Sequence, residues 1–135
     1  MSTPRYDWWG YVKGMIGRYP SLLAERDALR QQSITSNLTG MPRSGGAQRA
    51  AEHAATRELP PVKQRELDAV ERAVVTTKRK ANGWDVLRLI DLVFWQRRFN
   101  LTDAAWKIGL SYRTAARYHR DFIRLVARYY GLLDD

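Results

Sequence analysis

The chain has 135 residues, with 23 Lys and Arg against 14 Asp and Glu, so its formal net charge at pH 7 is +9. This excess suits a polyanionic partner, and nucleic acid fits it better than a membrane surface does. The length allows one domain with a modest core, or a small domain with an arm. The absence of cysteine excludes a disulfide framework, a cysteine-based zinc site and a thiol nucleophile.

No targeting or membrane segment is predicted. Residues 1–9 lack the apolar core of a signal peptide. No apolar run approaches the ~20 residues needed to cross a bilayer. We therefore expect a cytoplasmic protein without a membrane partner.

A helical arm is predicted over residues 1–32. Apolar side chains recur from residue 5 onward at steps of three and four, at Tyr6, Trp9, Val12, Ile16, Tyr19, Leu22, Leu23 and Leu29. Pro20 lacks a backbone N–H and is expected to kink or restart the helix. The aromatic residues either cover the core of the C-terminal part or form a subunit contact in a homo-oligomer, since aromatic anchors are enriched at interfaces.

A linker loop and a helical spacer are predicted next. Residues 33–47 are dominated by Ser, Thr, Asn, Gly and Pro, which predicts a loop. The spacer, residues 48–81, begins with an Ala-rich helix that ends before Pro60, because a residue preceding proline is disfavoured in the α region. Pro61 suits the first turn of a second helix, from about Val62 to Ala81. The basic run Lys78–Lys80 at its end is either a solvated helix terminus or a phosphate clamp.

Residues 84–98 predict a helix that is apolar almost all round. Its apolar residues are Trp84, Val86, Leu87, Leu89, Ile90, Leu92, Val93, Phe94 and Trp95. Such a helix is normally central and buried. We expect it to begin near Asp85 and to be the first helix of a three-helix module over residues 84–133. Arg97 and Arg98 either serve a DNA backbone or simply end the helix.

Residues 101–120 match a helix-turn-helix. Thr102 is placed to cap a short helix, with Asp103 in its first turn, where the helix dipole favours an acid. Gly109 is expected to leave that helix with positive φ. Ser111 then caps a longer helix that runs to about Tyr130 and ends at Gly131. This order of elements is that of the motif whose second helix enters the DNA major groove.

The longer helix carries a row of arginines. Arg113, Arg117, Arg120, Arg124 and Arg128 follow one another at steps of four, three, four and four, which puts them on one side of a helix. The opposite side holds Ala115, Tyr118, Phe122, Leu125, Val126 and Tyr129. One side is therefore expected to pack and the other to meet phosphate.

Roles follow from position on the motif. Arg113 and Arg117 are predicted to contact base edges, because Arg can bind guanine O6 and N7 with two hydrogen bonds. Ser111 and Tyr112, near the helix N-terminus, are expected at phosphates. The remaining candidate contacts to the DNA backbone are Lys107, Arg120 and Arg124, and both Arg124 and Arg128 lie roughly 10 to 20 Å farther along the helix.

The alternative is a helical protein-interaction module with a solvated basic face. Against it, Asp121 is the single acid near the arginine row, whereas a helix that is merely soluble usually mixes both signs.

No catalytic, metal or cofactor site is predicted. His53 and His119 are far apart and belong to no metal-spaced cluster, and His119 is expected to pack. Asp85 and Asp91 lack a third carboxylate to hold Mg²⁺ as in nucleases. We therefore expect a protein that is not an enzyme.

The chain resembles the phage transcriptional regulators of the RinA and ArpU type, whose C-terminal helix-turn-helix is similar to region 4 of sigma factors. The shared residues are Met41–Gly46, with the sequence Met-Pro-Arg-Ser-Gly-Gly, and Leu101–Arg120. The resemblance implies a bacterial host cell, binding to double-stranded DNA at promoters of late phage genes, activation, and contact with RNA polymerase. A small terminase subunit, which also joins a helix-turn-helix to helical oligomerisation segments, is the alternative among DNA-binding proteins.

Overall fold

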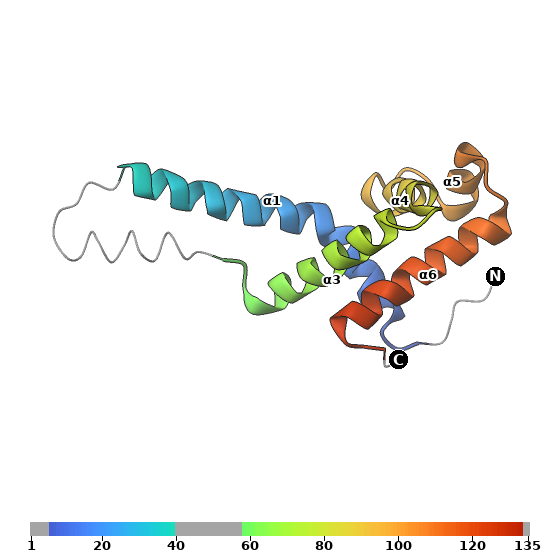
Figure 1. Cartoon of the computed structure of the whole chain (residues 1–135), viewed down its shortest axis with the longest axis horizontal. Helices are drawn as coiled ribbons and strands as arrows, with labels where there is room; N and C mark the ends of the chain where they lie inside the picture. The colour runs from blue at the N-terminus through green and yellow to red at the C-terminus, as the bar shows by residue number, and fades with distance from the viewer. Residues whose placement is uncertain (1–5, 40–57, 134–135) are drawn as a thin grey trace. The chain divides into compact units, whose positions relative to one another are not determined.

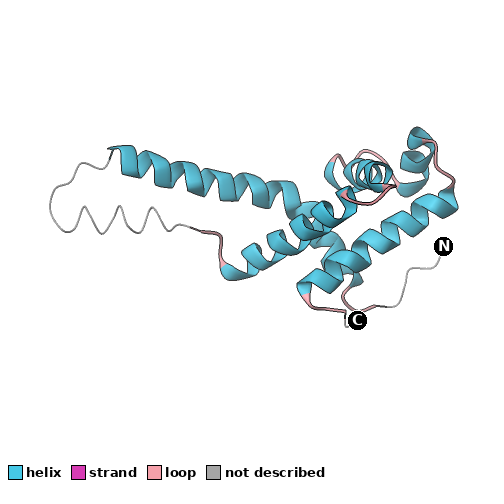
Figure 2. Cartoon of the chain, viewed as in Figure 1, coloured by secondary structure: helices cyan, strands magenta, loops and turns pink. Residues whose placement is uncertain are grey.

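The computed structural model describes residues 6–39 and 58–133, without the side chains of residues 33–39. Within these ranges the chain is helical and contains no strand, which confirms the predicted all-α class (Figures 1 and 2). None of the described helices is long and apolar enough to cross a membrane. The elements are α1 (Trp9–Thr39), α3 (Pro61–Lys78), α4 (Gly83–Ile90), a π-helical turn (Asp91–Trp95), α5 (Leu101–Ile108) and α6 (Tyr112–Tyr130).

The chain divides into two compact units. One contains the chain up to Tyr19 together with Arg65 onward, and the other contains Pro20–Gln64. In the second unit Leu22 and Leu59 are buried, and Lys63 Nζ lies 3.1 Å from Glu25 Oε1. The Ala-rich helix predicted before Pro60 and the Met41–Gly46 motif lie outside the described residues.

The core of the larger unit joins both ends of the described chain. Trp9, Val12, Met15 and Ile16 of α1 are buried in one cluster with residues of the later helices: Ala69, Val70 and Ala73 of α3, Val86 and Ile90 of α4, Phe94, and Phe122, Ile123, Val126 and Ala127 of α6. The aromatic start of α1 therefore covers the core, the first of its two predicted roles. The sequence prediction separates residues 1–32 from residues 84–133, whereas the first turns of α1 share the core of the latter.

Helix α1 continues through Pro20, so the predicted restart of the helix at this residue is wrong. Proline lacks the N–H that would bond the carbonyl of Ile16 four residues earlier. In the structure the indole Nε1 of Trp95 donates to that oxygen at 2.9 Å. Arg97 NH2 donates to the next carbonyl, Gly17, at 3.3 Å. Side chains that follow α4 in the chain thus donate hydrogen bonds to the α1 carbonyls next to the helix hydrogen bond that Pro20 cannot make.

A double-mutant cycle tests this substitution of donors. Trp95→Phe should lower the free energy of unfolding by about 1 to 2 kcal/mol, partly because it leaves the Ile16 carbonyl without a donor. In a Pro20→Ala background the backbone N–H is restored, and the loss should be smaller by about 1 kcal/mol. Urea denaturation of the four proteins measures both values, and equal losses in the two backgrounds would contradict the interpretation.

Other predicted boundaries shift by part of a turn or more. Helix α1 extends to Thr39, into the predicted linker, and α3 begins at Pro61 as expected but ends at Lys78 rather than Ala81. Gly83, not Asp85, begins α4. A side chain at residue 83 would not fit, because a Cβ there would lie 2.2 Å from the Thr77 carbonyl oxygen.

The apolar helix predicted over residues 84–98 is shorter and more exposed than expected. It widens into the π-helical turn, where Gln96 N donates to Asp91 O at 2.8 Å, and it ends there. Arg97 follows with a φ of 57°. Trp84 is 87% exposed, so the helix is not buried all round.

His119 packs in the core, as expected. Its ring stacks on Phe94 at a centroid distance of 5.4 Å and meets the edge of Trp9 at 6.4 Å. Its Nδ1 is buried without a hydrogen-bond partner among the described residues. Burial, together with the positive charge of Lys13, lowers the pKa of His119 to about 4.

This burial predicts a loss of stability in weak acid. Between pH 6.5, the usual histidine pKa, and about pH 4, the unfolded chain binds a proton that the folded chain does not. Stability should therefore fall as the pH drops through this window, by about 2 kcal/mol between pH 7.5 and 5. His119→Phe should remove this part of the dependence, as measured by denaturation at both pH values. An unchanged difference between the two pH values would contradict the assignment.

Candidate nucleic-acid interface

Helix α5 is capped by Asn100, and the predicted cap at Thr102 is wrong. Asn100 has extended backbone angles, and its side-chain oxygen accepts from Asp103 N at 2.8 Å. The helix begins at Leu101, so Thr102 lies in its first turn. Asn is among the strongest capping residues, and here it lies two positions before the other candidate.

Alanine substitutions distinguish the two caps. Asn100→Ala should lower the free energy of unfolding by about 1 kcal/mol, because the amide of Asp103 loses its acceptor. Thr102→Ala, the matched control, should change it by less than about 0.5 kcal/mol. Thermal and urea denaturation measure both; a larger effect at Thr102 would restore the sequence prediction.

The turn between α5 and α6 follows the predicted chemistry. Gly109 has a φ of 88°, and its N–H donates to Ala105 O at 3.0 Å. The Leu110 N–H also donates to Ala105 O, at 2.9 Å. Ser111 caps α6, because its Oγ accepts from Thr114 N at 3.1 Å. These bonds fix the direction in which α6 leaves the turn.

A second core cluster holds α5 and α6 against α4 and the π-helical turn. Its buried residues are Leu89, Leu92, Ala104, Ala105 and Ala115. Small side chains at Ala104, Ala105 and Ala115 let the helix backbones approach closely. The first turns of α6 are thus supported from behind, which leaves their opposite side to solvent.

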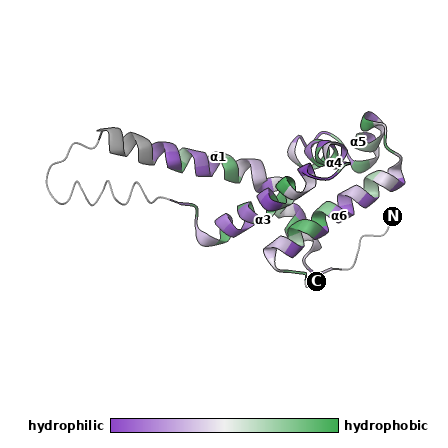
Figure 3. Ribbon diagram, in the orientation of Figure 1, coloured by the Kyte–Doolittle hydropathy of each residue, from purple (hydrophilic) through white to green (hydrophobic). Residues whose placement is uncertain are grey.

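Helix α6 separates into a packed side and a basic side. Its buried residues are Ala115, His119, Phe122, Ile123, Val126 and Ala127. Tyr118, Leu125 and Tyr129, predicted on this side, are partly buried and pack against the cores. Arg113, Arg117, Arg120 and Arg128 are exposed. The ribbon of α6 in Figure 3 accordingly alternates between hydrophilic and hydrophobic colours.

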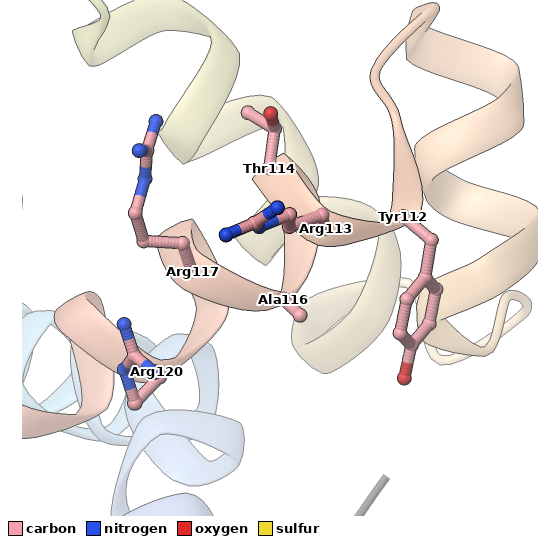
Figure 4. A pocket seen from close by; sticks show the side chains of 6 residues that line it. All are labelled: Tyr112, Arg113, Thr114, Ala116, Arg117 and Arg120. Carbon is pink, nitrogen blue, oxygen red and sulfur yellow. The ribbon is translucent and has the colours of Figure 1, made fainter.

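The exposed side has a hollow along the first half of α6. It is lined by Tyr112, Arg113, Thr114, Ala116, Arg117 and Arg120 (Figure 4). Arg113 makes no ion pair or hydrogen bond with another described residue. Arg117 lies 5.7 Å from the ring centre of Tyr118, and Arg120 Nε lies 3.6 Å from Asp121 Oδ1. Four of the seven predicted contact residues thus meet at one surface.

The other three lie apart from this hollow or are engaged. Lys107 is exposed on α5, with its Nζ 5.4 Å from the ring centre of Phe99. The Ser111 hydroxyl serves the cap. Arg124 is half-buried, and its NH1 donates to the Tyr6 hydroxyl at 2.6 Å. Arg124 therefore has a structural partner, which a prediction from helix periodicity does not detect.

Sequence reasoning missed two residues of this surface. Thr114 lines the hollow, and its position three residues after the cap Ser111 is the signal that could have found it. Tyr6 covers Arg124 with both its hydroxyl and its ring, whose centre lies 5.6 Å from the guanidinium carbon. No local pattern links residues so far apart in the chain.

The two arginines predicted to end the preceding helix have separate environments. The Arg97 side chain donates to Phe94 O and to Gly17 O, both at 3.3 Å. It therefore links the backbone of the π-helical turn to the backbone of α1. Arg98 is exposed.

Within the described ranges, no three His, Asp or Glu side chains are grouped so that they could hold a metal ion. No protein-family model, curated protein sequence or solved structure matches this chain.

Proposed function

We propose that the protein is a sequence-specific DNA-binding transcriptional regulator that places the first half of α6 in the major groove. The observation that carries this proposal is the arginine side of α6, with Arg113, Arg117 and Arg120 lining one hollow. The buried side of the same helix is fixed by two core clusters. A helix that is packed on one side and exposes arginines on the other is what groove recognition needs.

The order of the elements supports the same placement. In a helix-turn-helix the second helix presents its N-terminal residues to base edges. Here those residues are Tyr112, Arg113 and Ala116, and Arg117 lies one turn after Arg113. Arginine can bind guanine O6 and N7 together, so Arg113 and Arg117 supply specificity. Arg120 and Lys107 supply contacts to phosphate, which position the helix without reading sequence.

Arg124 has a different role in this proposal. Because it donates to Tyr6, it fixes the segment before α1 against α6 rather than contacting a base. The sequence-specific part of the helix then ends near Arg120.

The biological setting rests on the sequence resemblance. The motifs Met41–Gly46 and Leu101–Arg120 resemble phage regulators of the RinA and ArpU type. We accordingly propose that the DNA is a promoter of late phage genes in a bacterial host. Contact with RNA polymerase is part of that proposal.

Selection from a random pool of duplexes, followed by binding measurements, tests the function. The wild type should enrich one sequence and prefer it over a scrambled duplex. Arg113→Ala with Arg117→Ala should lower affinity for the enriched duplex by about 100-fold or more, because each bidentate contact to guanine contributes about 1 to 3 kcal/mol. Affinity for the scrambled duplex should fall by much less, since phosphate contacts dominate there.

A matched control removes the same charge elsewhere. Arg30→Ala with Lys63→Ala changes two exposed basic residues and should keep the preference for the enriched duplex. Wild-type affinity that stays flat between 50 and 200 mM salt would overturn the proposal, because phosphate contacts release counterions. A preference that survives in the Arg113 and Arg117 variant would overturn the assignment of these two residues.

A further inference from the structure

The turn between α3 and α4 carries the second concentration of positive charge in the larger unit. Lys78, Arg79 and Lys80, which we call the basic turn, are all exposed. None of the three is paired with an acid among the described residues. Three adjacent, unpaired cations repel one another, and an external anion would relieve that repulsion.

The basic turn and the residues after it lie against the middle of α6. A small recess is lined by Thr77, Lys80, Asn82 and Val86 on one side and by Tyr118, Asp121, Phe122 and Leu125 of α6 on the other. Lys80 therefore lines the same recess as Asp121. The turn is also tightly packed, because Gly83 approaches the Thr77 carbonyl more closely than any side chain would allow.

The recess adjoins the arginine side of α6. Asp121 lies one helical turn after Arg117, and its Oδ1 is 3.6 Å from Arg120 Nε. Asp121 is the single acid of α6, and Arg120 offsets its charge. Asp121 therefore lies between the hollow that Arg120 lines and the recess that Lys80 lines.

We propose that the basic turn binds the sugar-phosphate backbone of the same duplex whose major groove receives α6. This inference rests on the proposed function and adds a second point of attachment to it. DNA backbone fits better than an acidic protein segment, because Lys80 shares its recess with Asp121, whose neighbour Arg120 lines the hollow on α6. Contacts to phosphate at the flank of the groove would fix the register and orientation of α6.

The salt dependence of binding to the enriched duplex tests this attachment. Each phosphate contact contributes about 0.9 to the slope of log affinity against log salt concentration. The triple variant Lys78→Gln, Arg79→Gln and Lys80→Gln should lower the magnitude of the slope by about 2 to 3 and weaken binding. It should do so equally on enriched and scrambled duplexes, so the ratio between them should stay unchanged. Lys80→Gln alone should lower the slope by about 1, which keeps the test available if the triple variant does not fold.

The control removes the same three charges from other exposed positions, with Lys13→Gln, Arg30→Gln and Lys63→Gln. Its slope should remain close to that of the wild type. An unchanged slope in the basic-turn variant, with steep and selective wild-type binding, would overturn this inference and leave the proposed function standing. An equal fall in the control would also overturn it, because the effect would then be one of net charge. Absence of salt-dependent binding by the wild type would overturn both.

Discussion

The burial of α1 behind α6 is the contact on which the rest of the larger unit depends. A helix with five arginines along one side repels itself, and helices in proteins owe most of their stability to the packing of their apolar side. Its opposite side compensates, because burying a large apolar side chain contributes about 1.5 to 3 kcal/mol. Trp9, Val12, Met15 and Ile16 supply part of the surface that buries it, together with residues of α3, α4 and the π-helical turn. The charged side can remain open to solvent because the other side is so fully covered.

A buried carboxylate sets how α1 and α3 meet inside this unit. Glu66 accepts a hydrogen bond from the Tyr11 hydroxyl and another from Arg18 at 3.1 Å. Burial and the bond to Glu66 raise the pKa of Tyr11, so its hydroxyl stays protonated and remains a donor. A buried charge is costly when it lacks partners. Only the register that brings both donors to Glu66 avoids that cost, so the carboxylate selects the alignment of the two helices.

Local chemistry was enough to predict some features and not others. The cap at Ser111, the positive φ of Gly109 and the end of α6 at Gly131 depend on neighbouring residues, and all three predictions are confirmed. The exposure of Trp84 was missed because periodicity shows which residues share a side but not which side another helix covers.

The passage of α1 through Pro20 was missed for a related reason, since its replacement donor, Trp95, is distant in sequence. The same holds for Arg124, whose partner Tyr6 lies at the other end of the chain. The cap of α5 was wrongly predicted at Thr102 because two good capping residues lie close together, and Asn100, just before the helix, is the one that accepts the hydrogen bond. The hollow on α6 was largely predictable because one helix supplies all its described lining residues.

The contact between Trp9 and His119 has a consequence for how the chain acquires its structure. The ribosome makes α1 before α6, so the aromatic side of α1 emerges before the helix that packs on it. Local helices can form early, but a core that joins distant residues must wait for loop closure, which slows folding. During synthesis that side of α1 is apolar surface without its native neighbours, and such surface favours aggregation or capture by a chaperone. The buried side of α6 therefore reaches its native packing only after α1 and α6 have met.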